Sequence, residues 1–163
     1  MIIGLTGKNA SGKGEVSNYL KTKGFIYYSL SDIIREEATK TGLDHSRDNL
    51  INLGNELRKK YGPNYLAKEI SKKILSSRKN FFVIDSIRNP FEAKELMGNE
   101  DFVLLGIEAP IELRFERLLR RGRLGDAKTL EGFKQQEERE NLKSDSNQQL
   151  DETFKLADKV ILN

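Results

Sequence analysis

The strongest constraint on the fold of this sequence is a run of eight residues near its start, GKNASGKG at 7–14. Their G-x-x-x-x-G-K spacing is typical of a loop that wraps a phosphate group with successive backbone N–H groups. The apolar run IIGLT precedes the loop, and a helical pattern through Val16 and Leu20 follows it. In that order, the positive end of the helix dipole lies behind the phosphate. We therefore predict a phosphate-binding loop between a strand and a helix, with a plain glycine-rich turn as the alternative.

Within this loop, Lys13 is expected to bridge the β- and γ-phosphates of ATP and to neutralise charge during phosphoryl transfer. The usual pattern places Ser or Thr after the lysine to hold Mg²⁺, but Gly14 stands there, followed by Glu15. Magnesium then needs other ligands, and Glu15 either faces solvent or reaches the metal through water. The residues expected to bind the nucleotide are Gly7, Lys8, Asn9, Ala10, Ser11, Gly12, Lys13, Gly14 and Glu15.

Short apolar segments alternate with helical patterns along all 163 residues. The alternation predicts a three-layer α/β fold with a five-stranded, mostly parallel sheet covered on both faces. The length suits one domain. Strands are expected at 2–6, 25–29, 81–85, 101–108 and 159–162. After the first helix, further helices are expected from a cap at Ser31 or Asp32 towards Thr41, and at about 46–61, 64–78, 90–97, 110–121, 129–142 and 146–157.

The amino-acid composition excludes several kinds of functional site. The chain has no cysteine and one histidine, which excludes disulfides and thiolate sites and argues against a histidine-rich metal site. The net charge of +3 suits anionic ligands but is too balanced to indicate nucleic acid. No apolar run approaches the roughly 18 residues of a membrane span, and no signal peptide precedes the glycine-rich loop. A cytoplasmic location without membrane partners is the expectation.

Charged residues are expected at the carboxyl edge of the sheet, where open α/β sheets bind ligands. Asp85 ends a buried strand and could orient Mg²⁺ through water, or instead cap the helix near Pro90. Arg88 follows in the same loop, and Arg35 lies on the helix after the second strand, so both could pair with an acceptor phosphate. The residues expected to bind the acceptor are Asp32, Arg35, Arg58, Asp85 and Arg88.

Five arginines gather between positions 114 and 123, in LRFERLLRRGR. The glycines beyond them loosen the chain, which favours a short lid at about 121–128, while helices at about 31–78 would cover the acceptor. Arg121 and Arg123 could bring positive charge to the transferred phosphoryl group, and Arg117 could contact the nucleotide. A solvated basic helix or a nucleic-acid contact is the alternative. The catalytic candidates are Lys13, Arg88, Arg121 and Arg123.

The motifs GKNASGKG, SDIIR, DSIRNP and RLLRRGR, in this order and spacing, resemble the nucleoside monophosphate kinase group of P-loop proteins. Nearly the whole chain looks like small adenylate-kinase-like or dephospho-CoA-kinase-like proteins of archaea and bacteria. The resemblance implies that Arg35 and Arg88 hold the acceptor phosphate. It also implies that Arg117, Arg121 and Arg139 act around the lid and the transferred phosphate.

The expected activity is transfer of the γ-phosphoryl group of ATP, with Mg²⁺, to a nucleoside or deoxynucleoside monophosphate. A dephospho-CoA-type kinase and a regulatory ATPase module without a small acceptor stay open as alternatives. The expected partners are small nucleotides. The oligomeric state and the acceptor base are left undetermined.

Overall fold

The structure, a computed structural model, describes residues 1–122, 125–141 and 145–163. The strands are β1 (Ile2–Thr6), β2 (Ile26–Ser29), β3 (Phe82–Asp85), β4 (Phe102–Glu108) and β5 (Lys159–Leu162). The helices are α1 (Lys13–Thr22), α2 (Leu30–Lys40), α3 (Arg47–Tyr61), α4 (Tyr65–Leu75), α5 (Pro90–Met97), α6 (Ile111–Arg121), α7 (Leu130–Glu140) and α8 (Leu150–Phe154).

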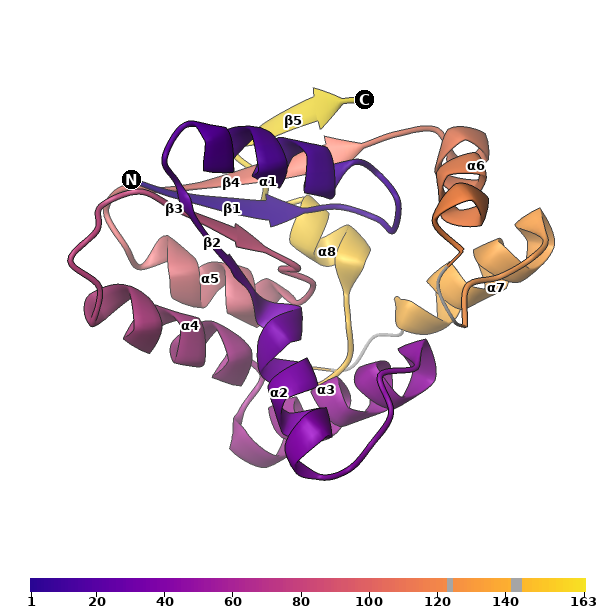
Figure 1. The fold of residues 1–163 in the computed structure, drawn as a ribbon, viewed down its shortest axis with the longest axis horizontal. Coiled ribbons are helices and arrows are strands. Elements are labelled where there is room, and N and C mark those ends of the chain that lie inside the picture. Colours follow the sequence, from indigo (N-terminus) through magenta and orange to yellow (C-terminus); the bar gives the residue numbers. More distant parts are fainter. Residues whose placement is uncertain (123–124, 142–144) are drawn as a thin grey trace.

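The five strands form one sheet in the order β2-β3-β1-β4-β5, and each neighbouring pair is parallel. The predicted fold class is confirmed. β1 lies at the centre, with Ile3 beside Val83 of β3 and Val103 of β4. The arrows of β1 and β4 point towards the side of the molecule where α6 and α7 lie (Figure 1). The loop after β1 and the segment after β3 therefore meet at one edge of the sheet.

Helices cover both faces of the sheet. α1 lies on one face, while α5 and α8 lie on the other, with α4 packed against α5 (Figure 1). Side chains at the centre of the sheet are fully buried, as expected for parallel strands that are apolar on both faces. Among these buried side chains are Leu5, Val83, Ile84, Leu104 and Ile107.

The start of α2 differs from the prediction. Its N-cap is Ser29, whose side chain accepts a hydrogen bond from the backbone N–H of Ser31 at 3.3 Å. The expected cap at Ser31 or Asp32 is therefore wrong, because β2 passes into α2 without a loop. By contrast, the break between α3 and α4 falls at Gly62 as predicted, with a φ of 105°.

The last helix is much shorter than the pattern over 146–157 suggested. Only Leu150–Phe154 is helical. The buried side chain of Asn89 donates hydrogen bonds to the carbonyls of Asp145 (2.8 Å) and Asn147 (2.7 Å). These bonds tie the segment before α8 to the start of α5 and hold it out of a helix.

No helix within the described ranges is long and apolar enough to cross a lipid bilayer.

Candidate active site

The glycine-rich loop has the backbone of an anion cradle. Gly7 and Gly12 have φ values of 135° and 107°, in the region that favours glycine. A Cβ at Gly7 would lie 2.1 Å from the carbonyl oxygen of Ile107, so the loop approaches β4 too closely for any other residue. Within the described ranges, no protein group accepts a hydrogen bond from the backbone N–H groups of residues 9, 10, 12, 13 and 14. These groups are left for an anion.

The Lys13 side chain folds back over this loop. Its Nζ donates hydrogen bonds to the carbonyls of Gly7 (2.7 Å) and Lys8 (2.8 Å). Burial lowers the pKa of Lys13 from 10.5 to about 8, although Asp85 opposes the shift. A phosphate beside Nζ would favour the charged form.

Asp85 lies at the carboxyl end of β3, beside the loop. Its Oδ1 accepts a hydrogen bond from the backbone N–H of Ser86 at 2.6 Å, and its Oδ2 accepts one from the Tyr27 hydroxyl at 3.3 Å. Burial and the Asp85 carboxylate raise the pKa of Tyr27 to about 12, which keeps this donor protonated. Ser86 has a φ of 66°, a strained conformation of the kind that gathers at functional sites.

Asp85 is not the cap of α5. That cap is Asn89, which accepts from the N–H of Phe91 and forms a capping box with Glu92. Asp85 therefore keeps carboxylate lone pairs that face the loop.

Arg88 is a cation that has no carboxylate partner among the residues the structure describes. Its Nη1 donates to the Gln148 side chain at 3.3 Å, and no described carboxylate lies within 4.0 Å of its guanidinium. Burial lowers the pKa of Arg88, while the charges of Glu140 and Asp85 act in the opposite direction. A poorly compensated guanidinium in such a place is stabilised by a bound anion.

Two cavities meet at this point. The first, which we call the loop cavity, has a volume of about 680 Å³. It is lined by residues 9–15 of the loop, by Tyr27, Ser29, Asp85, Ser86 and Arg88 from the strand ends, and by Arg35, Arg117, Arg121 and Asn163. Its charged lining within the described residues comprises five cations and two carboxylates, Glu15 and Asp85. This balance suits a polyanion.

The second cavity, the helix cavity, has a volume of about 460 Å³ and lies against α2, α3 and α4. Apolar side chains from these helices form part of its wall, together with Ser31, His45, Arg47, Arg58, Asp126 and Gln148. The two cavities share five lining residues: Asn9, Arg35, Ser86, Arg88 and Arg121.

Most of the predicted site residues line these cavities. Three of the described ones do not. Gly7 belongs to the loop but lines neither cavity. Asp32 lines neither cavity and instead accepts a hydrogen bond from Arg35 Nη1 at 2.7 Å. Lys8 points away from the loop cavity, with its Nζ 3.3 Å from Asp151. Arg123 lies outside the described residues, so the expected lid at 121–128 is described only in part.

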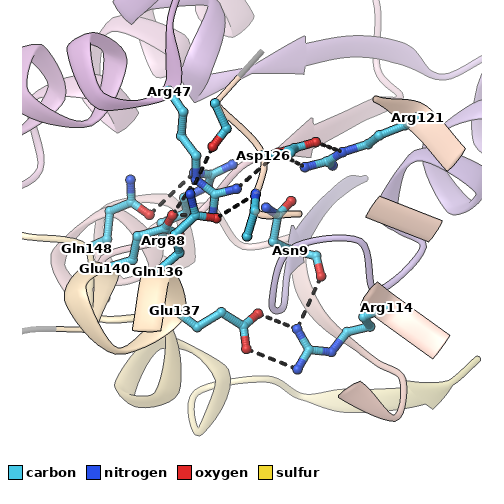
Figure 2. Close-up of polar contacts among 12 residues, drawn as sticks. Asn9, Arg47, Arg88, Arg114, Arg121, Asp126, Gln136, Glu137, Glu140 and Gln148 are labelled. Carbon is cyan, nitrogen blue, oxygen red and sulfur yellow. Dashed lines mark hydrogen bonds and ion pairs between the residues drawn. The ribbon is translucent and has the colours of Figure 1, made fainter. Parts of the chain in front are cut away.

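The arginines of α6 divide into different roles. Arg117 and Arg121 line the loop cavity, and Arg117 also donates to the carbonyl of Ser11 at 3.3 Å. Arg114 is buried and bonds to Glu137 of α7 and to the carbonyl of Asn9, so it braces the loop from behind (Figure 2).

Two other arginines do not reach either cavity. Arg120 is exposed, 4.0 Å from Glu116, and Arg139 lines a separate cavity.

A charge network joins the helices on opposite sides of the helix cavity. Asp126 accepts from Nε and Nη2 of Arg121, both at 2.9 Å, and from Arg47 Nη1 at 3.3 Å. Arg47 also pairs with Glu140 of α7 through Nε at 2.7 Å (Figure 2). Arg121 therefore lines both cavities while its guanidinium is paired with Asp126.

Arg58 lies at the wall of the helix cavity and is 2% exposed. Its Nε donates to Glu92 Oε1 at 2.8 Å. The predicted acceptor-binding residue is therefore also one half of a buried ion pair.

Carboxylates are sparse at the site. No cluster of three or more His, Asp or Glu side chains that could hold a metal ion occurs among the described residues. Asp85 and the exposed Glu15 are the carboxylates that line the loop cavity in this part of the chain. A divalent cation here would depend on ligand phosphates and water as well as on Asp85.

Several lining residues had no signal in the sequence. Asn163 donates to the carbonyl of Ser11 at 3.0 Å from the end of β5, and Gln148 reaches Arg88 across 60 positions of chain. His45 is exposed and lines the helix cavity. Only the sheet order brings these residues to the site.

A parallel sheet of this order, with a glycine-rich loop between β1 and α1 and basic residues at the carboxyl edge, defines the α/β fold of P-loop kinases. The chain belongs to the AAA domain family, whose model matches residues 6–134, and groups with the UPF0200 proteins. The UPF0200 protein PH1008 of Pyrococcus horikoshii is 37% identical, over 100% of this chain and 88% of its own length. The UPF0200 protein of Thermococcus gammatolerans is 34% identical, over 86% and 76%.

Solved structures share the fold. TT1252 from Thermus thermophilus aligns with a TM-score of 0.66 and 22% identity, over 100% of this chain and 88% of its own. Shikimate kinase from Bacteroides thetaiotaomicron aligns with a TM-score of 0.60 and 13% identity, over 99% and 86%.

Proposed function

We propose that this protein transfers the γ-phosphoryl group of ATP to a nucleoside or deoxynucleoside monophosphate. The observation that carries the proposal is the junction of the two cavities, where Arg35, Arg88 and Arg121 line both. A donor phosphate in one cavity and an acceptor phosphate in the other would meet at these three guanidinium groups. Charge neutralisation between two approaching anions is the main task of such a catalyst.

The loop cavity supports binding of the ATP phosphates. Free backbone N–H groups surround the place where the β-phosphate would lie, and Lys13 is next to it. Mg²⁺, when bound, would add positive charge to the phosphate oxygens, and Asp85 would hold it through water. Arg117, which lies over the loop, would contact the nucleotide.

The carboxylates favour a phosphate acceptor over a hydroxyl acceptor. A hydroxyl, as in a dephospho-CoA-type reaction, needs a general base within hydrogen-bond reach. Asp126 is the carboxylate that lines the helix cavity in the described part of the chain, and it already accepts bonds from Arg121 and Arg47. Asp32 lines neither cavity. A monophosphate needs no base, because its oxygens are already ionised at neutral pH.

In the reaction, an acceptor oxygen attacks the γ-phosphorus and the bond from that phosphorus to the bridging oxygen breaks, leaving ADP. Arg35 and Arg88 would position the acceptor phosphate, while Lys13 and Arg121 would stabilise the developing charge. Arg121 must exchange Asp126 for phosphate oxygens to do so. The proposal includes the expected lid at 121–128, which would close over the bound nucleotides during the reaction.

The test mixes the protein with Mg-ATP and each member of a panel of ribo- and deoxynucleoside monophosphates and dephospho-CoA, and follows ADP and product mass. Acceptor-dependent ADP with a phosphorylated monophosphate is the expected result. A product formed only from dephospho-CoA would assign the hydroxyl reaction instead. ADP formation that no acceptor changes would indicate an ATPase module.

A further inference from the structure

The Arg58–Glu92 pair lies where α3 meets α5. The side chains are 2% and 0% exposed. Glu92 Oε1 accepts from Arg58 Nε, and its Oε2 accepts from the backbone N–H groups of Arg88 (3.0 Å) and Asn89 (3.1 Å). Both carboxylate oxygens therefore accept hydrogen bonds, and Oε1 anchors the guanidinium through Nε.

Arg58 keeps hydrogen-bond donors for a ligand. Beyond Nε, its Nη1 makes one long bond of 3.4 Å to the Asn55 side chain. A guanidinium has five N–H groups, so three of them have no acceptor among the described residues. In that part of the chain, the Oγ of Ser11 is the buried side-chain polar atom without a partner. Nη2 of Arg58, which has no acceptor among these residues, is therefore not fully buried, and Arg58 lines the helix cavity.

The walls around Arg58 suit a flat ring. Leu30, Ile34, Leu50, Ile51 and Leu66 line the helix cavity, and none of them lines the loop cavity. Apolar side walls with a few polar groups are the usual environment of a bound aromatic ligand. The phosphate of an acceptor would lie at the shared arginines, which leaves its base between these apolar residues and next to Arg58.

Resting on the proposed function, we infer that Arg58 reads the acceptor base and selects one that presents two adjacent hydrogen-bond acceptors. A guanidinium only donates, so its two terminal nitrogens need acceptor atoms side by side. Guanine offers O6 and N7, and cytosine offers O2 and N3. Adenine has its N6 donor beside both N1 and N7, and uracil has an N–H between its two carbonyls. Both would leave buried donors of Arg58 unsatisfied.

The sharpest test uses the wild-type protein with base analogues. Titration calorimetry and the ADP assay would compare GMP with IMP, which keeps O6 and N7, and with 7-deaza-GMP, which lacks N7. CMP would be compared with zebularine monophosphate, which keeps O2 and N3, and with 3-deaza-CMP, which lacks N3. Loss of one ring acceptor should lower affinity and kcat/KM roughly 10- to 100-fold. Loss of the exocyclic amine should matter much less, and the two series show which base is used.

Variants then assign the effect to Arg58. Arg58→Lys keeps the charge but not the fork, and should bring AMP and the preferred nucleotide to within a few fold of each other. Glu92→Gln is the structural control, because it weakens the same buried pair but leaves the Arg58 donors in place. It should lower the melting temperature and keep the base preference. If Arg58 were only structural, both variants would melt earlier with the base preference unchanged.

The outcomes separate this inference from the function it rests on. A phosphorylated monophosphate with a preference for AMP or UMP would overturn the reading by Arg58 and keep the kinase. Discriminating binding of GMP or CMP without any turnover would keep the reading and overturn the transfer reaction. No binding of any monophosphate would overturn both.

Discussion

Lys13 donates hydrogen bonds to two carbonyls of its own loop, and a nucleotide would replace these bonds with phosphate oxygens. Lys13→Ala removes the cation that would neutralise the negative charge of the phosphoryl group during its transfer. We expect kcat/KM to fall at least roughly 10²- to 10³-fold, the effect typical of a lost transition-state donor. The ADP assay measures it, with Lys23→Ala, on the exposed turn after α1, as the matched control. Near-normal activity of Lys13→Ala would reject the site.

The lowered pKa of Lys13 predicts opposite pH effects on activity and on stability. The cationic form prevails below pH about 8, so kcat/KM for ATP should fall about tenfold per pH unit above that value. The folded state binds this proton less tightly than the unfolded state, whose pKa is near 10.5. The free energy of unfolding should therefore gain from this group between pH about 8 and 10.5.

The measurement is a pH profile of kcat/KM and of urea unfolding. Lys13→Arg is the control, because a guanidinium does not titrate in this range. Its residual activity should be flat up to pH 10. A wild-type profile that is equally flat would show that another group sets the charge at the loop.

At the scale of elements, the second residue of α1, Gly14, is a glycine that packing does not require. A Cβ at Gly14 would meet no atom within 4 Å. Gly14→Ala should therefore stabilise the protein by up to about 1 kcal/mol, because alanine loses less conformational freedom in a helix. Thermal unfolding measures the change. A destabilised variant would mean that the first turn of α1 is less regular than described.

Gly14→Ser adds a hydroxyl at the position where this class of loop usually holds Mg²⁺. We expect the Mg²⁺ concentration for half-maximal activity to fall relative to Gly14→Ala, which controls for the helix effect. Equal Mg²⁺ dependence of the two variants would place the metal away from this position.

Asn89 connects two elements of the site. Its side chain caps α5 and donates to two carbonyls before α8, and it is fully buried. Asn89→Ala should lower the free energy of unfolding by about 2 kcal/mol, from the lost cap and the unsatisfied carbonyls. The corresponding fall in melting temperature is about 4–8 °C for a chain of this length.

The same variant should raise the KM for the acceptor, because the backbone of Arg88 accepts a bond from Gln149 in the tethered segment. Asn89→Asp keeps the acceptor that caps α5 and loses the side-chain donor. Its stability and its KM for the acceptor should lie between those of the wild type and Asn89→Ala. Equal stability of Asn89→Ala and wild type would contradict the tether.

At the scale of the whole molecule, Arg47 connects α3 with α7 and with Asp126 beside the helix cavity. Its side chain is 14% exposed and pairs with Asp126 and Glu140, which are 79 and 93 positions away. Arg47→Met removes the guanidinium that pairs with the nearly buried Glu140 and takes one hydrogen bond from Asp126, which keeps Arg121. The change should cost about 3 kcal/mol. We expect the melting temperature to fall by about 6–12 °C.

The double variant Arg47→Met/Glu140→Gln tests whether the pairing is the cause. It should recover part of the loss, because the Glu140 charge that Arg47→Met leaves uncompensated is gone. Strictly additive effects would mean that the two residues do not interact in solution.

The sequence by itself determined the class of fold and the position of the glycine-rich loop between β1 and α1. The strands and helices were readable because apolar residues repeat at the period of each element, and all thirteen described elements match a predicted segment. The loop at 7–14 was readable because glycines and a lysine lie close together in the chain. Among the elements, the sequence missed the cap at Ser29 and the short length of α8, because both depend on how neighbouring segments pack.

Tertiary structure decided which side chains face the cavities. Arg114, Arg117 and Arg121 share a helix face in sequence, yet Glu137 draws Arg114 behind the loop while the other two line it. The binding of Asp126 to Arg121 and the pairing of Arg58 with Glu92 depend on how α3, α5 and α6 pack. Such contacts join residues far apart in the chain, and their free energy depends on burial, which no local pattern records.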